Sequence, residues 1–139
     1  MRQIIRAIGM LAAAAGPAAA ETEWRQETVR GLASYALAAE GGSATLFCDP
    51  DRVFGGTSNA SIAVTMPQGA RARIVVLLAA TGEQAALPLT DGRAAEKDVN
   101  PAEWRRMVEI IRAGGDLAFV TGEDAMRLLG VAPLPGLDC

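Results

Sequence analysis

The chain has 139 residues, enough for one domain with a single hydrophobic core and too few for two. Its 13 basic and 16 acidic residues give a net charge of -3, and the arginines are scattered, so no basic patch indicates nucleic-acid binding. Histidine is absent, which removes the usual general base and zinc ligand and excludes a Ser-His-Asp mechanism. Aromatic residues make up only 4% of the chain, so the core must consist mainly of Ala, Val, Leu and Ile.

Residues 1–20 are typical of a signal peptide. Arg2 and Arg6 give a positive start, a short apolar stretch follows, and Ala18-Ala19-Ala20 supplies the small residues that a signal peptidase recognises. A membrane anchor is the alternative, but a spanning helix needs about 20 uninterrupted apolar residues. We therefore expect cleavage after Ala20 and a single exported β-rich domain over residues 21–139, periplasmic or secreted, with no membrane span after cleavage.

The chain contains two cysteines, Cys48 and Cys139. In an oxidising compartment an even number of cysteines favours a disulfide, and the absence of a C-x-x-C spacing argues against a redox motif. Two free thiols are the alternative. We expect a Cys48–Cys139 disulfide that ties the first half of the fold to the end of the sequence.

The first part of the domain is predicted to be mainly β-structure. Residues 21–30 are polar and indicate an entering segment whose Trp24 packs on the edge of the domain. Two apolar-rich runs, 35–40 and 43–48, flank Gly41-Gly42, a pair that favours a tight hairpin turn with positive φ at both central residues. An Ala-rich helix over residues 32–40 is the competing interpretation.

A loop and three strands are predicted next. The composition of residues 49–59 is typical of a loop. Strand periodicity follows over 60–66, and the continuous apolar run within 71–79 suits a strand covered on both faces. A further strand is expected at 84–89, and Pro88 near its end favours an edge position.

The clearest helix signal begins at Asn100, which is a favourable N-cap. Pro101 suits the first helical position, and Glu103 at the third can return its carboxylate to the cap amide. Gly114-Gly115 is expected to end the helix. An apolar stripe with helical spacing should face the core: Trp104, Met107, Val108 and Ile111.

The C-terminal part is predicted to contain a strand and a second helix. The strand covers 116–120, and Thr121 with Asp124 three residues later indicates a capped helix running to Gly130. The proline-rich tail, 131–139, should be irregular and depend on Cys139 for its position. The resulting fold class is α+β, an antiparallel sheet or sandwich followed by a helix-strand-helix unit and closed by one disulfide.

Few motifs indicate chemistry. Asp49 and Asp51, with Asn59 later in the loop, offer oxygens for calcium, but they lack EF-hand spacing and Asp-Pro-Asp is more often a turn. A Ser-Lys dyad would need Lys97, the lone lysine, which lies in a charged stretch typical of a solvated loop. A pair of carboxylates able to hydrolyse glycosides depends on their separation in space. No catalytic, cofactor or metal residue is therefore predicted.

A resemblance rests on Leu46-Phe47-Cys48, Phe119-Val120-Thr121-Gly122, Ala125-Met126-Arg127-Leu128-Leu129 and Cys139. In this order they resemble small exported proteins of the invasion-associated locus B type and, more distantly, type VI secretion-associated periplasmic proteins. The chain departs from that pattern by inserting residues 131–137 before the last cysteine. The resemblance implies a disulfide-closed β-rich domain without known catalysis, in which residues 125–129 form a short helix and only the two cysteines carry over.

Together these observations predict an exported, non-enzymatic binding or envelope-associated module whose partner is an envelope or extracellular protein. The first alternative is a periplasmic inhibitor of a cell-wall hydrolase, which an exposed loop with acidic or serine side chains would favour. The second is a small carboxylate-dependent hydrolase, which requires a pocket with two convergent carboxylates of raised pKa.

Overall fold

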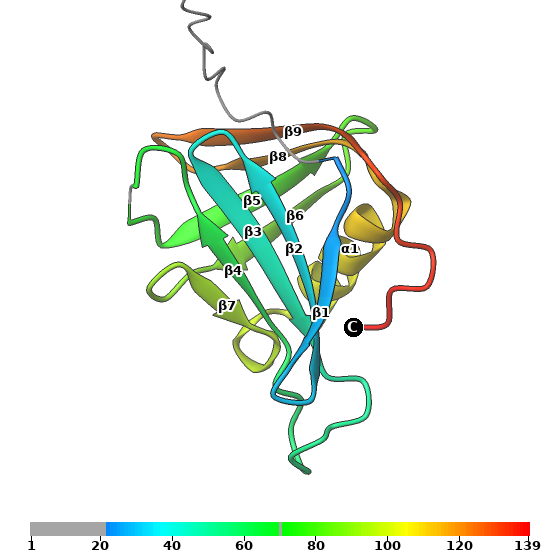
Figure 1. Cartoon of the computed structure of the whole chain (residues 1–139). Helices are drawn as coiled ribbons and strands as arrows, with labels where there is room; N and C mark the ends of the chain where they lie inside the picture. The colour runs from blue at the N-terminus through cyan, green and yellow to red at the C-terminus, as the bar shows by residue number, and fades with distance from the viewer. Residues whose placement is uncertain (1–21, 70) are drawn as a thin grey trace, which may run out of the picture.

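The computed structural model describes residues 22–69 and 71–139, so the predicted signal peptide lies outside the described residues. Within them, two antiparallel sheets pack with one α-helix (Figure 1). The first sheet has the order β1 (Arg25–Val29), β2 (Leu32–Ala39), β3 (Gly42–Cys48), β4 (Ser61–Thr65) and β7 (Arg93–Ala95). The second has the order β6 (Gln84–Pro88), β5 (Ile74–Ala79), β8 (Gly115–Val120) and β9 (Ala125–Val131). The short 3-10 helix η1 (Glu96–Asp98) precedes α1 (Pro101–Ala113).

The first strand, β1, was not predicted as a strand. It pairs with β2 through a two-residue turn in which Arg30 and Gly31 both have positive φ, 51° and 83°. This is the primed geometry that matches the twist of a hairpin. All five β1 residues are exposed, so the strand lacks the alternation of polar and apolar residues by which a half-buried strand is recognised. Trp24, just before it, is buried.

The second hairpin, β2–β3, confirms the predicted pairing and rules out the alternative helix. Ala39 lies opposite Gly42, so the turn is Glu40-Gly41, one residue earlier than expected, and of these two only Gly41 has a positive φ. Gly42 instead begins β3, at a point where the two sheets meet closely. A Cβ atom at Gly42 would lie 2.6 Å from the Thr65 carbonyl oxygen and 2.7 Å from the Met126 sulfur.

The core is one cluster of buried side chains contributed by both sheets and the helix. Strand β5 shows the alternation: Val75 and Leu77 are fully buried, whereas on the other face Ile74 is exposed and Val76 and Leu78 are partly buried. One face of the strand is therefore fully covered and the other only in part, where cover of both faces was predicted. Strand β6, with Pro88, is an edge strand, as predicted. Large side chains at the centre of the cluster are Leu37, Leu46, Ile62, Leu77, Leu87, Phe119, Met126 and Leu128.

Helix α1 was predicted correctly in its bounds and its buried stripe, to which the structure adds Ile110. The Asn100 side chain accepts a hydrogen bond from the Ala102 N–H at 2.9 Å, which confirms the cap. Glu103 does not close the predicted capping box. Its carboxylate accepts from the Ala86 N–H of edge strand β6 at 2.8 Å and pairs with Arg106 at 3.3 Å, so the helix satisfies a backbone donor on that edge.

The predicted second helix was wrong, because residues 125–131 form strand β9, paired with β8. Thr121 and Asp124 close the intervening hairpin turn: the Thr121 N–H donates to the Asp124 carbonyl at 2.9 Å, and the Thr121 hydroxyl accepts from the Asp124 N–H at 3.0 Å. Met126 and Leu128 are buried while Arg127 is exposed, the period of a strand. The C-terminal unit is therefore helix-strand-strand. No helix in the described part of the chain is long and apolar enough to cross a membrane.

Candidate binding surface

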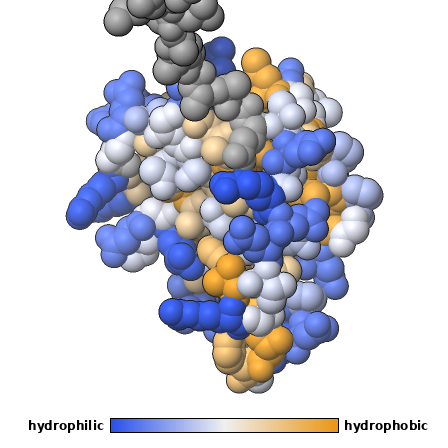
Figure 2. Space-filling view, in the orientation of Figure 1, coloured by the Kyte–Doolittle hydropathy of each residue, from blue (hydrophilic) through white to orange (hydrophobic). Residues whose placement is uncertain are grey.

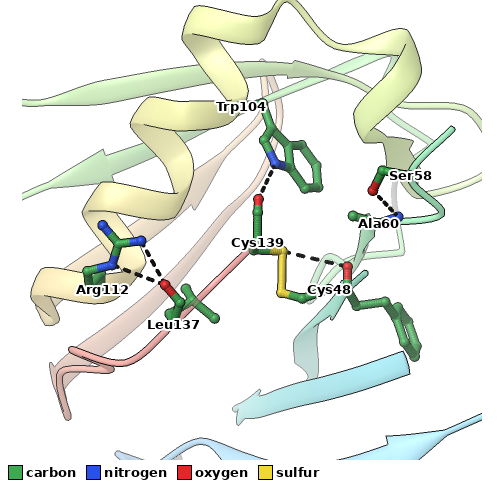
Figure 3. Close-up of a disulfide and its surroundings, with 8 residues drawn as sticks. Cys48, Ser58, Ala60, Trp104, Arg112, Leu137 and Cys139 are labelled. Atoms are coloured by element: carbon green, nitrogen blue, oxygen red, sulfur yellow. Dashed lines mark hydrogen bonds between the residues drawn. A yellow bond between two sulfur atoms is a disulfide. The ribbon is translucent and has the colours of Figure 1, made fainter. Parts of the chain in front are cut away.

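The predicted disulfide is present between Cys48, the last residue of β3, and Cys139, with 4.8 Å between the Cα atoms (Figure 3). The bond fixes the C-terminal tail beside the start of the β3–β4 loop, residues 49–60. It thereby brings together three segments far apart in sequence: this loop, the tail and the outer side of α1.

The tail does not depend on the disulfide alone, contrary to expectation. The Arg112 guanidinium donates two hydrogen bonds to the Leu137 carbonyl, at 3.2 and 2.7 Å, and the Trp104 indole N–H donates to the Cys139 main-chain oxygen at 3.1 Å. Figure 3 shows both side chains pointing from α1 toward the tail. Leu137 is also buried in the core cluster.

The β3–β4 loop is braced by Asp49, a buried carboxylate. One of its oxygens accepts from the Val53 N–H at 2.9 Å, and the other accepts from the Asn59 N–H at 3.0 Å and the Asn59 amide at 3.3 Å. The backbone hydrogen bonds from Asn59 and Val53 hold the pKa of Asp49 below its usual value of 3.8. The carboxylate therefore fixes both ends of the loop in its ionised form.

The three oxygen-bearing residues considered for calcium are thus only partly brought together. Asp49 and Asn59 hydrogen-bond to one another, whereas Asp51 is exposed on the loop. Over residues 22–69 and 71–139 no group of three or more His, Cys, Asp or Glu side chains is placed to hold a metal ion.

The loop presents an apolar tip, defined here as Val53 and Phe54 together with Val29, the last residue of β1 before the neighbouring β1–β2 turn. Their exposed fractions are 49%, 66% and 39%. The two turns are in contact, because a Cβ atom at Gly31 would lie 3.6 Å from a Val53 methyl group. Figure 2 shows apolar atoms gathered at the lower end of the molecule, where Figure 1 places both turns.

Behind the tip, between the inner side of the loop and α1, lies an open cleft of about 930 Å³. We call it the basic cleft, because four cationic side chains line it against two acidic side chains, Glu96 and Asp138. Trp104, Val108 and Cys139 contribute to its wall next to the disulfide. The four cations are Arg52, Lys97, Arg105 and Arg112.

Sequence reasoning missed this cleft because its cations come from the loop, η1 and two turns of α1, and only folding gathers them. A partial signal exists in the helix: Arg105, Val108 and Arg112 are spaced by three and four residues and so share one face. Comparison of the chain with protein-family models, with curated proteins and with solved structures finds no match.

Proposed function

We propose that the protein is an exported, non-enzymatic binding module of a bacterial envelope, and that the apolar tip and the basic cleft form its contact surface. The predicted leader and the disulfide support export, since disulfides persist in oxidising compartments. The resemblance to small exported proteins of the invasion-associated locus B type stays a prediction that agrees with this proposal.

One observation carries the proposal: Phe54 is 66% exposed on a loop whose backbone is held at both ends by a buried carboxylate. Gly55 and Gly56, with φ of 74° and 68°, complete the turn that presents it. A large aromatic side chain held out by a preorganised loop is the kind of anchor that dominates protein interfaces, because little entropy remains to be lost on binding. Loops braced on a rigid scaffold are also where binding residues concentrate.

The hydrolase alternative has weaker support. Among the described residues Asp49 is the buried carboxylate, and hydrogen bonds lower its pKa, whereas a general acid needs a raised one. Both of its oxygens already accept hydrogen bonds from the loop. Asp49 therefore has a structural role, which is to hold the loop in place.

The inhibitor alternative is favoured by one specific observation: a protruding loop that carries exposed Asp51 next to the apolar tip. In that case the loop would enter the active-site groove of a cell-wall hydrolase. Addition of the purified protein should then lower peptidoglycan hydrolysis by the captured partner, which the general binding module need not do.

Affinity capture from envelope extract tests the proposal, with wild-type protein compared with Phe54→Ser and Leu129→Ser. Leu129 is the matched control, because its side chain is 65% exposed on β9, outside the tip and the cleft. We expect Phe54→Ser to lose the captured partner and Leu129→Ser to retain it. Equal capture by Phe54→Ser and wild type would show that the contact surface lies elsewhere. No specific capture by wild type would overturn the binding function.

A further inference from the structure

We infer that the basic cleft binds an acidic segment of the partner, a stretch of peptide that carries both carboxylate and apolar side chains. The inference rests on the proposed binding function and names the chemistry of the partner at that surface.

The cleft is large enough for several side chains. Its volume of about 930 Å³ lies near the upper end of the range found for ligand pockets. One wall is the inner side of the loop, from Gly56 to Ser58, and the opposite wall follows α1 from Pro101 to Arg112. An extended peptide can therefore lie along three turns of the helix while the apolar tip of the same loop contacts the rest of the partner.

The charge of the cleft is opposite in sign to that of the chain. Four cationic side chains against two acidic ones and the main-chain carboxylate of Cys139 leave a local excess of one positive charge, in a chain with a net charge of -3. Arg112 is held in position by its two hydrogen bonds to Leu137, so one cation loses little freedom when a ligand binds. The α1 N-terminus at Pro101 adds the positive end of a helix dipole to the same wall.

The apolar wall decides between kinds of anion. The apolar part of the wall consists of exposed Pro101 and the edges of Trp104 and Val108, which are 4% and 5% exposed, so part of the surface offers no hydrogen-bond donors. A phosphate polymer gains little from such a wall, whereas a peptide can place an apolar side chain against it and its carboxylates toward Lys97 and Arg105. The mixed lining therefore favours an acidic, partly apolar peptide over a nucleic acid.

The test uses fluorescence anisotropy with the purified protein and a labelled hexapeptide of alternating glutamate and leucine. The cleft variant is Lys97→Gln with Arg105→Gln. The matched control is Arg73→Gln with Arg127→Gln, two exposed arginines outside the cleft. We expect the cleft variant to weaken binding by about 3- to 10-fold, the scale of two exposed charge pairs, and the control to match wild type. Raising salt to about 0.5 M should weaken wild-type binding as well.

Three outcomes would overturn the inference. A lysine-leucine hexapeptide could bind as tightly as the acidic one, or the cleft and control variants could lose the same amount of affinity for the acidic peptide. In the third outcome, a single-stranded oligonucleotide displaces the labelled peptide at a lower concentration than unlabelled peptide does. Capture that still depends on Phe54 after such a result would leave the binding function standing without the acidic ligand. If the cleft variant loses the peptide while Phe54→Ser still captures the partner, the acidic ligand of the cleft stands and the apolar tip is not the contact surface.

Discussion

Replacing Cys139 by Ser should destabilise the protein chiefly through its unfolded state. The disulfide closes a sequence separation of 91, for which the chain-entropy model gives about 4.6 kcal/mol of stabilisation. The folded tail keeps its other contacts, since Arg112 still holds Leu137 and Trp104 still reaches residue 139. We therefore expect the free energy of unfolding to fall by about 2 to 5 kcal/mol, the usual loss for a native disulfide, while the tail stays docked.

Denaturant unfolding followed by tryptophan fluorescence measures this loss, because Trp24 and Trp104 are both buried and report on the packed state. The double variant Cys48→Ser with Cys139→Ser is the control, since it lacks the bond without leaving an unpaired thiol. Both variants should unfold at the same denaturant concentration, and reductant should move wild type to that value. An unchanged wild-type midpoint in reductant, or two titratable thiols in the oxidised protein, would refute the reasoning.

Three further predictions concern the scaffold. Gly42→Ala should destabilise by about 1 to 3 kcal/mol in denaturant unfolding, because its Cβ would lie 2.6 Å from the Thr65 carbonyl oxygen of the same sheet and 2.7 Å from the Met126 sulfur of the other sheet; an unchanged midpoint would contradict this close packing. Asn100→Ala should lower the free energy of unfolding by about 1 kcal/mol through loss of the bond to the Ala102 N–H, and Asn100→Asp should restore it. Asp49 has a lowered pKa in the folded state, so its ionised form contributes to the free energy of unfolding. This contribution is present above the usual pKa of 3.8 and is lost as pH falls through the folded-state pKa. Thermal melts of wild type and Asp49→Asn should therefore converge on acidification below about pH 4, and a constant difference down to lower pH would exclude this role.

Sequence reasoning located elements whose signals are local. The cap, first-turn proline and apolar stripe of α1 lie within a few residues of one another, and they gave its bounds correctly. The same reasoning failed at residues 125–131, because a threonine followed three residues later by an aspartate occurs both at helix starts and in hairpin turns. What decides between these is the pairing of β9 with β8, which is a tertiary interaction.

The candidate surface likewise has one part that the sequence predicted and one part that it did not. The disulfide was predictable because only Cys48 and Cys139 were available to pair. The basic cleft was not, because Arg52 and Arg105 lie more than fifty residues apart and only the fold brings them to one opening. Asp49 was singled out for its oxygens, and the structure gives those oxygens a different task, holding the loop that exposes Phe54.

Site-specific photo-cross-linking tests the central claim most directly. A photoreactive phenylalanine analogue placed at residue 54 lies on the apolar tip, and the same analogue at residue 129 is equally exposed on β9. In envelope extract the account predicts a cross-linked partner from position 54 and none from position 129. A product from position 129 alone, or the same product in equal yield from both positions, would contradict the assignment of this loop as the contact surface.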